Sequence, residues 1–263
     1  MVKTIFITGS GSGIGKAVAI ALAQRGHRVI ASAHHGADAE KLNQMAREDS
    51  LPLESIVLDV TSASDRKKIL AYDVDVLINN AGIGETGSLA EINIEKVRQN
   101  FEVNVFGTFE LTQLALKSMM KKDTGTVIFI SSLLGRTTSA FFGPYSMTKF
   151  ALSSGAEMLR DELEKKKKNV QVAIIEPGAY ATGFNQKMMA KKYEWMGKSS
   201  YFYRLIGDIK KREAKRFNLF EEKNLSSIVT KIVAAAEADK PKLRSVAPWW
   251  QGLGVSILRA FGK

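Results

Sequence analysis

A tyrosine and a lysine stand four residues apart, at Tyr145 and Lys149, in a stretch whose pattern predicts a helix over 143–165. Residues at positions i and i+4 share one helix face, so the phenol and the ammonium can lie together. A free tyrosine has a pKa of about 10, and a nearby cation lowers that pKa by favouring the phenolate. The pair therefore predicts a proton donor or acceptor that works nearer neutral pH. Alone it is a weak signal, because such pairs also occur on exposed helix surfaces.

The first strand-like run, at residues 2–8, continues into a glycine-rich loop with the sequence Thr8-Gly9-Ser10-Gly11-Ser12-Gly13-Ile14-Gly15. Glycines allow a tight turn and a close approach of the backbone to a pyrophosphate, and the following helix offers free N–H groups at its start. The spacing is G-x-x-x-G-x-G, and no frame fits G-x-G-x-x-G. A P-loop is excluded because Ala17, not Ser or Thr, follows Lys16. The loop predicts a dinucleotide site, with a plain glycine-rich turn as the alternative.

Two more groups of small and polar residues follow strand-like runs. The run at 74–79 continues into Asn79-Asn80-Ala81-Gly82, and the run at 124–131 ends at Ser131 and Ser132. In an open α/β sheet, ligands bind beyond the carboxyl ends of the strands. These groups and the start of the 143–165 helix should therefore lie beside the glycine loop. That coincidence is the main evidence for an active site next to a bound nucleotide.

Strand-like and helical patterns alternate along most of the chain, which predicts a parallel sheet with helical crossovers. Uniformly apolar runs such as 170–175 are typical of strands covered on both faces. We expect an α/β fold over 1–263, a single three-layer, doubly wound Rossmann domain with about seven strands. The expected strands are 2–8, 27–33, 53–58, 74–79, 124–131, 169–175 and 242–247, and the expected helices are 13–25, 37–48, 62–70, 89–120, 143–165, 223–238 and 250–260.

Two C-terminal segments depart from this alternation. Residues 179–222 carry many methionines and aromatic residues among lysines and arginines, which predicts an insertion, helical near 183–222, that covers the substrate. Residues 249–263 begin with Trp249 and Trp250 and continue with apolar residues at helical spacing. They predict an amphipathic tail, either packed on the core or a second subunit or in peripheral contact with a membrane.

Composition excludes several classes of site. The chain has no cysteine, so disulfides, thiolate nucleophiles and cysteine metal sites are absent, and its three histidines make a histidine-rich metal centre improbable. We predict no metal. The net charge of +11 favours anionic ligands, but no nucleic-acid-binding motif is present, so no nucleic-acid partner is expected. No stretch reaches the roughly 20 apolar residues of a membrane span, and no signal peptide is apparent, so a cytoplasmic protein is expected.

The end of the second strand-like run bears on the choice of cofactor. An acidic residue there holds the ribose 2′-hydroxyl of NAD, but the run ends Ala31-Ser32-Ala33-His34-His35, without a carboxylate. Ser32, His34 and His35 are suited to contact a 2′-phosphate instead, an exposed turn being the alternative. We therefore expect NADP(H) to be favoured over NAD(H).

Over residues 3–182 these motifs resemble those of the short-chain dehydrogenase/reductase family. The resemblance rests on the loop from Thr8 to Gly15, on Asn79-Asn80-Ala81-Gly82, and on Ser132, Tyr145 and Lys149, with Ser132 thirteen positions before Tyr145. Five further positions match the family's helix asparagine, adenine-contacting aspartate and nicotinamide-contacting segment, namely Asn104, Asp59, Pro177-Gly178 and Thr182. One departure is that many NADP-using members carry arginine where His34 stands, or a basic residue where Ser12 stands.

The resemblance implies an NAD(P)(H)-dependent oxidoreductase that acts on a small carbonyl or alcohol, and a homodimer or homotetramer. It implies that Tyr145 is the general acid or base, that Lys149 lowers its pKa and holds the nicotinamide ribose, that Ser132 binds the substrate oxygen, and that Asn104 holds a water in a proton relay. The implied cofactor contacts are Thr8, Gly9, Ser10, Ser12, Gly13, Ile14, Gly15, His34, Asp59, Val60, Asn80, Ala81, Gly82, Tyr145, Lys149, Pro177, Gly178 and Thr182.

Apolar residues near these positions suggest a large apolar substrate of steroid, retinoid or acyl type. The expected substrate contacts are Ser132, Leu133, Phe141, Phe142, Tyr180, Phe184, Met188 and Met189. The long insertion resembles that of hydroxysteroid- or retinol-type members. Two alternatives remain: a reductase of 3-oxoacyl thioesters of an acidic carrier protein or coenzyme A, whose acidic groups would suit the basic insertion, and a non-catalytic NADP(H)-binding sensor or scaffold.

Overall fold

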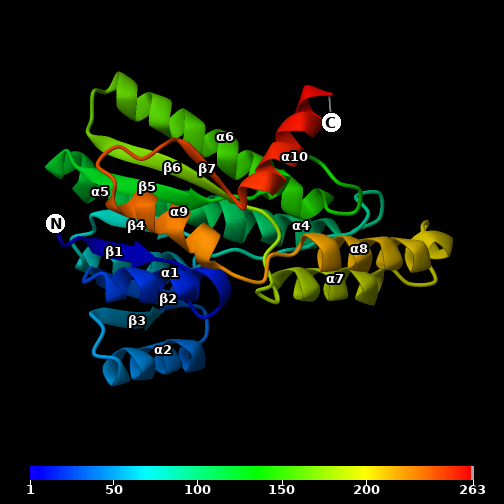
Figure 1. The fold of residues 1–263 in the computed structure, drawn as a ribbon, viewed down its shortest axis with the longest axis horizontal. Coiled ribbons are helices and arrows are strands. Elements are labelled where there is room, and N and C mark those ends of the chain that lie inside the picture. Colours follow the sequence, from blue (N-terminus) through cyan, green and yellow to red (C-terminus); the bar gives the residue numbers. More distant parts are fainter. Residues whose placement is uncertain (262–263) are drawn as a thin grey trace.

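The computed structural model describes residues 1–261 of the chain. Seven parallel strands form one sheet in the order β3-β2-β1-β4-β5-β6-β7 (Figure 1). Because β1 pairs with both β2 and β4, the strand order reverses there, and the expected doubly wound α/β fold with seven strands is confirmed. The strands are β1 (Thr4–Ile7), β2 (Arg28–Ala33), β3 (Leu53–Val57), β4 (Val76–Asn79), β5 (Gly125–Ile130), β6 (Val170–Pro177) and β7 (Arg244–Ala247).

Helices cover both faces of this sheet. One face packs against α1 (Gly13–Gln24), α2 (Gly36–Glu48) and α9 (Ser226–Glu237), and the other against α5 (Gly107–Lys122) and α6 (Gly143–Lys165). Alternate residues of a strand point to opposite faces, so Ile5 and Ile7 join the first core while Phe6 joins the second. Both faces are apolar for this reason, as the uniformly apolar strand runs indicate.

The helix expected over 89–120 begins later and is interrupted. The structure has α4 (Ile94–Phe101), a π-helical turn (Glu102–Phe106) and then α5, while residues 89–93 are not helical. The helix starts at Ile94 because the side chain of Asn93 caps it, accepting the Glu95 N–H at 2.9 Å. The helix expected over 62–70 is likewise split, into α3 (Ala63–Arg66) and a 3-10 turn (Lys67–Ala71).

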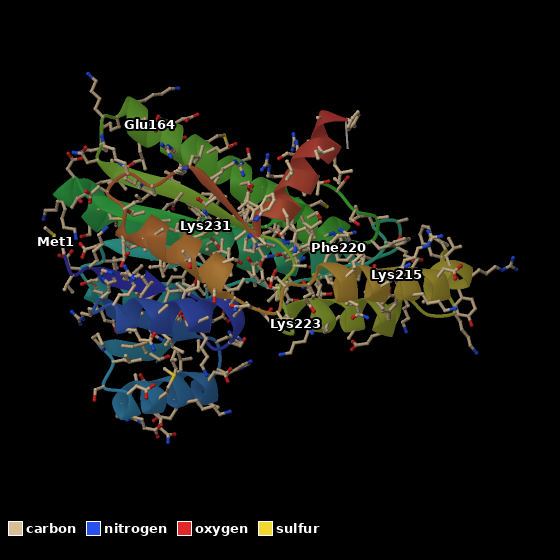
Figure 2. All side chains as sticks on the ribbon, in the orientation of Figure 1. Met1, Glu164, Lys215, Phe220, Lys223 and Lys231 are labelled. Carbon is tan, nitrogen blue, oxygen red and sulfur yellow. The ribbon has the colours of Figure 1, made fainter. Side chains whose placement is uncertain are left out.

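The insertion contains two helices, α7 (Phe184–Trp195) and α8 (Ile206–Phe220), which lie side by side and project from the body of the fold (Figure 1). The two helices are joined by a buried ion pair between Lys192 and Glu213, and the Tyr193 hydroxyl donates to the same carboxylate at 2.6 Å. Phe220 lies at the end of α8 nearer the sheet, and Lys215 farther out (Figure 2).

The last helix is α10 (Trp249–Ala260), which follows β7. Its exposed face carries Trp249, Leu253 and Ile257, as the amphipathic spacing indicates. The end of the expected tail, 262–263, lies outside the described residues. Within residues 1–261 no helix combines the length and apolar character needed to cross a membrane.

One buried carboxylate links the last two strands. Glu176 of β6 is fully buried and forms ion pairs with Arg244 of β7 and, at 3.5 Å, with Arg136. Burial raises the pKa of the Glu176 carboxyl, although both guanidinium groups oppose that rise. The two arginines therefore offset part of the cost of burying this carboxylate.

We expect Arg244→Met to lower the free energy of unfolding by about 3 kcal/mol, because Glu176 would keep only the more distant Arg136. Arg25→Met is the matched control: its ion pair with Glu237 is at the surface, so the loss should stay below about 1 kcal/mol. Urea denaturation of both variants measures the difference. Equal losses would show that the buried pair has no special role.

Candidate active site

The glycine loop lies between β1 and α1, at the carboxyl edge of the sheet. Gly9 and Gly13 have φ values of +69° and +56°, which favour glycine. A Cβ on Gly15 would lie 2.3 Å from the Gly9 carbonyl oxygen, so no other residue fits there without a shift of the loop. Ser12 precedes α1 without capping it through its side chain. The first N–H groups of α1 can therefore bind a ligand, and the helix dipole favours a negatively charged ligand there.

The loop after β4 holds the glycine loop in place. The Asn80 side-chain amide donates to the carbonyl oxygens of Thr8 and Gly9, each at 2.9 Å, and the Thr8 hydroxyl accepts the N–H groups of Asn80 and Ala81 at 3.0 and 2.9 Å. Thr8 and Ser10 are buried within the loop and do not line the cavity. Both side chains turn inward to shape the loop, and the expected cofactor contacts of Thr8 and Ser10 stay predictions.

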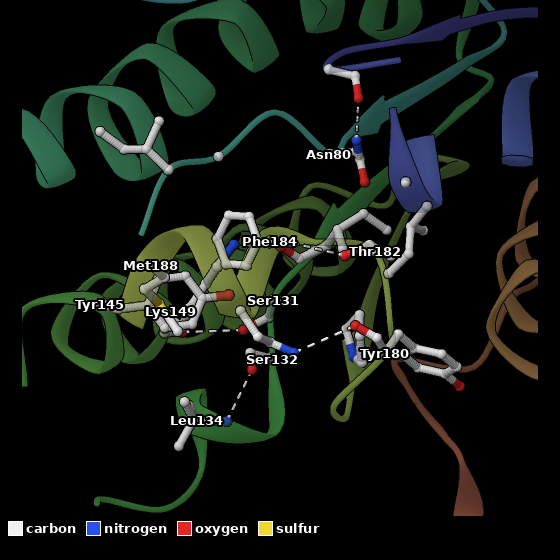
Figure 3. A pocket seen from close by; sticks show the side chains of 18 of the residues that line it. Asn80, Ser131, Ser132, Leu134, Tyr145, Lys149, Tyr180, Thr182, Phe184 and Met188 are labelled. Carbon is white, nitrogen blue, oxygen red and sulfur yellow. Dashed lines mark hydrogen bonds between the residues drawn. The ribbon is translucent and has the colours of Figure 1, made fainter. Parts of the chain in front are cut away.

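Tyr145 and Lys149 lie on α6, and the Lys149 Nζ is 5.6 Å from the centre of the Tyr145 ring. Both side chains are buried, and Lys149 donates to the Ile130 carbonyl oxygen at 2.8 Å. Ser132 follows β5 and accepts the Leu134 N–H at 3.1 Å. All three side chains line one cavity of about 1400 Å³, which the glycine loop also lines (Figure 3).

Burial acts on the two ionisable groups in opposite directions. It raises the pKa of Tyr145 to about 12, although the hydrogen bond with Ser132 opposes the rise, and it lowers the pKa of Lys149 to about 8. The expected lowering of the tyrosine pKa is therefore not the net effect, because loss of solvation outweighs the hydrogen bond with Ser132. Near neutral pH the phenol keeps its proton, while the amine is close to losing one.

Asn104 lies in the π-helical turn and is buried. Its side chain accepts the Ile83 N–H at 2.8 Å and donates to the Ile83 carbonyl oxygen at 2.9 Å and the Thr148 hydroxyl at 3.0 Å. A Cβ on Gly82 would lie 3.2 Å from Asn104 Oδ1 and 3.8 Å from Lys149 Nζ, so both side chains adjoin Gly82. Asn104 itself does not line the cavity, and its role in a proton relay stays a prediction.

On the other side of the glycine loop, the cavity extends past the ends of β2 and β3. His34 and His35 lie here with ring centres 4.7 Å apart. Asp38, in the first turn of α2, lies beside the glycine loop: a Cβ on Gly11 would be 3.3 Å from its Oδ2. Sequence reasoning missed Asp38 as a cavity residue, although an acidic residue early in the helix after β2 is a usable signal.

The expected contacts that line the cavity are Gly9, Ser12, Gly13, Ile14, Gly15, His34, Asp59, Val60, Asn80, Ala81, Gly82, Pro177, Gly178 and Thr182.

The remaining part of the cavity carries several aromatic and aliphatic side chains. The rings of Tyr145 and Phe184 are 5.7 Å apart, and Phe142 faces Phe217 of α8 at 6.4 Å. The expected substrate contacts that line this part are Ser132, Leu133, Phe142, Tyr180, Phe184 and Met188.

Two expected contacts lie elsewhere, and the last helix lines the cavity, which the sequence analysis did not predict. Phe141 packs edge-on against Phe202 at 5.2 Å, and neither it nor Met189 lines the cavity. Phe141 adopts a φ of +65°, which turns its side chain to the insertion. Trp250, Val255 and Leu258 of α10 also line the cavity. Their helical spacing was visible in the sequence, but only the position of the helix shows what they face.

The family model for short chain dehydrogenases matches residues 3–193, which include every cavity segment described above except those from α8 and α10. The chain therefore belongs to the short-chain dehydrogenase/reductase family and is an oxidoreductase. Members of this family bind NAD(P)(H) and act on small molecules.

Three relatives illustrate the similarity. The chain is 37% identical over 179 residues to the probable short-chain type dehydrogenase/reductase VdlC of Helicobacter pylori, covering 65% of this chain and 63% of the relative. It is 32% identical to the uncharacterized oxidoreductase YbbO of Escherichia coli, covering 93% and 85%, and 29% identical to human retinol dehydrogenase 8, covering 92% and 80%. A solved short-chain dehydrogenase from Streptomyces avermitilis superposes with a TM-score of 0.78 at 29% identity, covering 99% of this chain and 95% of that one.

The lowered pKa of Lys149 predicts a gain of stability when its charge is removed. Below about pH 8 the folded protein buries a charged amine, whose pKa returns to 10.5 on unfolding. We expect Lys149→Met to raise the free energy of unfolding at pH 7, by up to about 3 kcal/mol. Because the wild type gains stability as pH rises from about 8 to 10.5, the difference should shrink over that interval.

Urea denaturation at pH 7, 8 and 9 measures this difference. Lys165→Met, at the exposed end of the same helix, is the control and should show no such pH dependence. A Lys149→Met variant that is less stable than the wild type at every pH would contradict the expectation.

Proposed function

We propose that the protein transfers a hydride between a nicotinamide cofactor and the carbonyl or alcohol carbon of an apolar substrate, with Tyr145 as general acid or base. One observation supports this most directly. Tyr145, Lys149 and Ser132 line the same cavity as the glycine loop, so proton transfer and nucleotide binding share one space. A non-catalytic sensor would not need these three groups together.

The residues present fit a dinucleotide. A Cβ on Gly9 or Gly15 would clash with neighbouring backbone atoms, so both positions need glycine. The free N–H groups at the start of α1 suit a pyrophosphate. The cavity extends from His34 at the end of β2 to Tyr145 on α6, which gives room for both halves of the cofactor. When bound, the nicotinamide supplies or accepts the hydride.

In the direction of reduction, the Ser132 hydroxyl donates a hydrogen bond to the substrate oxygen and Tyr145 delivers a proton to it as negative charge develops. Because burial raises the pKa of Tyr145 to about 12, the phenol is protonated and ready to donate at neutral pH. The phenolate left behind is stabilised by the nearby Lys149 ammonium. Phe184, Met188 and Phe217 pack in one apolar cluster with Tyr145 and Phe142 at this end of the cavity. In oxidation the proton moves the opposite way.

We infer that NADP(H) is favoured over NAD(H). The support is the pair His34 and His35 at the end of β2, where hydrogen-bond donors suit a 2′-phosphate, and the absence of a carboxylate from β2 itself. Sequence relatives do not decide this preference, because the family uses both nucleotides.

For the substrate we propose a steroid-, retinoid- or acyl-type carbonyl or alcohol. The apolar lining from β5, α7, α8 and α10 supports this class, as does the similarity to a protein named retinol dehydrogenase. In this proposal the hairpin α7–α8 is the substrate lid. A homodimer or homotetramer, a cytoplasmic location and contact of α10 with a membrane stay predictions.

A second candidate, reduction of 3-oxoacyl thioesters of coenzyme A or a carrier protein, has one supporting observation. Arg216 of α8 lines the cavity and donates to the Ser139 hydroxyl at 3.1 Å. An arginine at this position suits the phosphate groups of such carriers. Activity with 3-oxoacyl-coenzyme A but none with free ketones, aldehydes or alcohols would favour this candidate.

A panel of steroid, retinoid and 3-oxoacyl substrates, followed through the absorbance of NADPH or NADH, tests the proposal. Tyr145→Phe should lower kcat at least about 100-fold, because the acid is lost, while the Kd of the cofactor stays within about twofold since the ring remains. Tyr72→Phe, at a tyrosine that bonds Glu54 outside the cavity, is the control and should be as active as the wild type. Undiminished turnover in Tyr145→Phe would overturn the assigned role.

A further inference from the structure

Asp38 is a carboxylate of the nucleotide cavity that the proposed function does not use. It is half-buried in the first turn of α2. Within residues 1–261 its carboxylate oxygens form no hydrogen bond or ion pair, whereas Glu40 on the same helix pairs with Arg47 at 2.8 Å. An acid that faces a binding cavity without a partner is available to a ligand.

The position of Asp38 matches one part of a dinucleotide. Its side chain lies against Gly11 of the glycine loop, with Cβ 3.1 Å and Oδ2 3.3 Å from where a Cβ on Gly11 would be. His34 and His35, which end β2 and precede α2, line the same region of the cavity. In doubly wound folds the adenosine ribose binds between the glycine loop and the end of the second strand. Asp38 therefore faces the place of the ribose hydroxyls.

Neighbouring acids are already engaged. The carboxylate of Asp59 accepts both the N–H and the hydroxyl of Thr61 at 2.8 Å. Asp65 accepts the Asp59 N–H at 2.9 Å and pairs with Lys68 at 2.7 Å. Of the three aspartates at this end of the fold, Asp38 is the one with both carboxylate oxygens available within the described residues, since Asp59 accepts through Oδ1 and Asp65 is paired.

We propose that Asp38 supplies the carboxylate that β2 lacks: it accepts hydrogen bonds from the ribose hydroxyls of NAD(H), and its charge opposes the 2′-phosphate of NADP(H). A carboxylate has acceptor sites for two hydroxyl groups, whereas a nearby phosphate is repelled by it. His34 and His35, at the end of β2, favour the phosphate, so Asp38 limits the preference for NADP(H). This rests on the proposed function, because it requires a nicotinamide nucleotide in this cavity.

The test is the binding of reduced cofactors and of their adenosine halves to Asp38→Asn. NADH and NADPH are titrated by fluorescence, and 5′-AMP and 2′,5′-ADP by calorimetry, so the readout does not depend on turnover. Removing the charge should tighten NADPH and 2′,5′-ADP about tenfold and weaken NADH and 5′-AMP about threefold. Asp38→Ser should change the ratio in the same direction.

Asp49→Asn is the matched control, because it removes the same charge at the other, exposed end of α2. At physiological ionic strength a charge that far away is screened, so every Kd should stay within about twofold. If both Asp38 variants bind the nucleotides but the ratio of NADPH to NADH affinity is unchanged, the role of Asp38 is overturned and the proposed function stands. If the wild-type protein binds neither nucleotide, the proposed function is overturned, and the role of Asp38 with it.

Discussion

The close approach of two loops at the carboxyl edge of the sheet is the constraint on which the rest of the site depends. One amide side chain, that of Asn80, bonds two successive carbonyl groups of the glycine loop, at Thr8 and Gly9. The contact is possible because Gly15 has no side chain to fill the space between them. Since β4 lies between β1 and β5, the glycine loop and Ser132, which comes after β5, lie at one edge of the sheet and line one cavity.

Burial is the second physical effect that shapes the site. It raises the pKa of Tyr145 and lowers that of Lys149, so each group is displaced from its ordinary range by the same loss of solvent. The apolar residues that cause it come from the insertion as well as the core, since Phe184 and Met188 pack against Tyr145. The insertion therefore contributes to the burial of Tyr145, and burying ionisable groups in this way costs the folded state some stability.

Periodicity and motif spacing were enough for much of this arrangement. The helix over 143–165 has the bounds of α6, and the polar groups expected at strand ends do meet, because the carboxyl ends of parallel strands share one edge. What the sequence does not contain is the direction of individual side chains. Thr8 turns into the loop, Phe141 turns to the insertion, and the interruption before α5 reflects the contacts of Asn104 with Ile83 and Thr148. Tertiary contacts decide each of these, and no local pattern records them.

The central claim is that one crevice holds both the nucleotide and the proton-transfer groups. A crystal structure of the protein with NADP⁺ tests it most directly. The account predicts the pyrophosphate against the N–H groups at the start of α1 and the nicotinamide beside Tyr145 and Lys149. A nucleotide bound elsewhere, or a nicotinamide out of reach of both side chains, would contradict it.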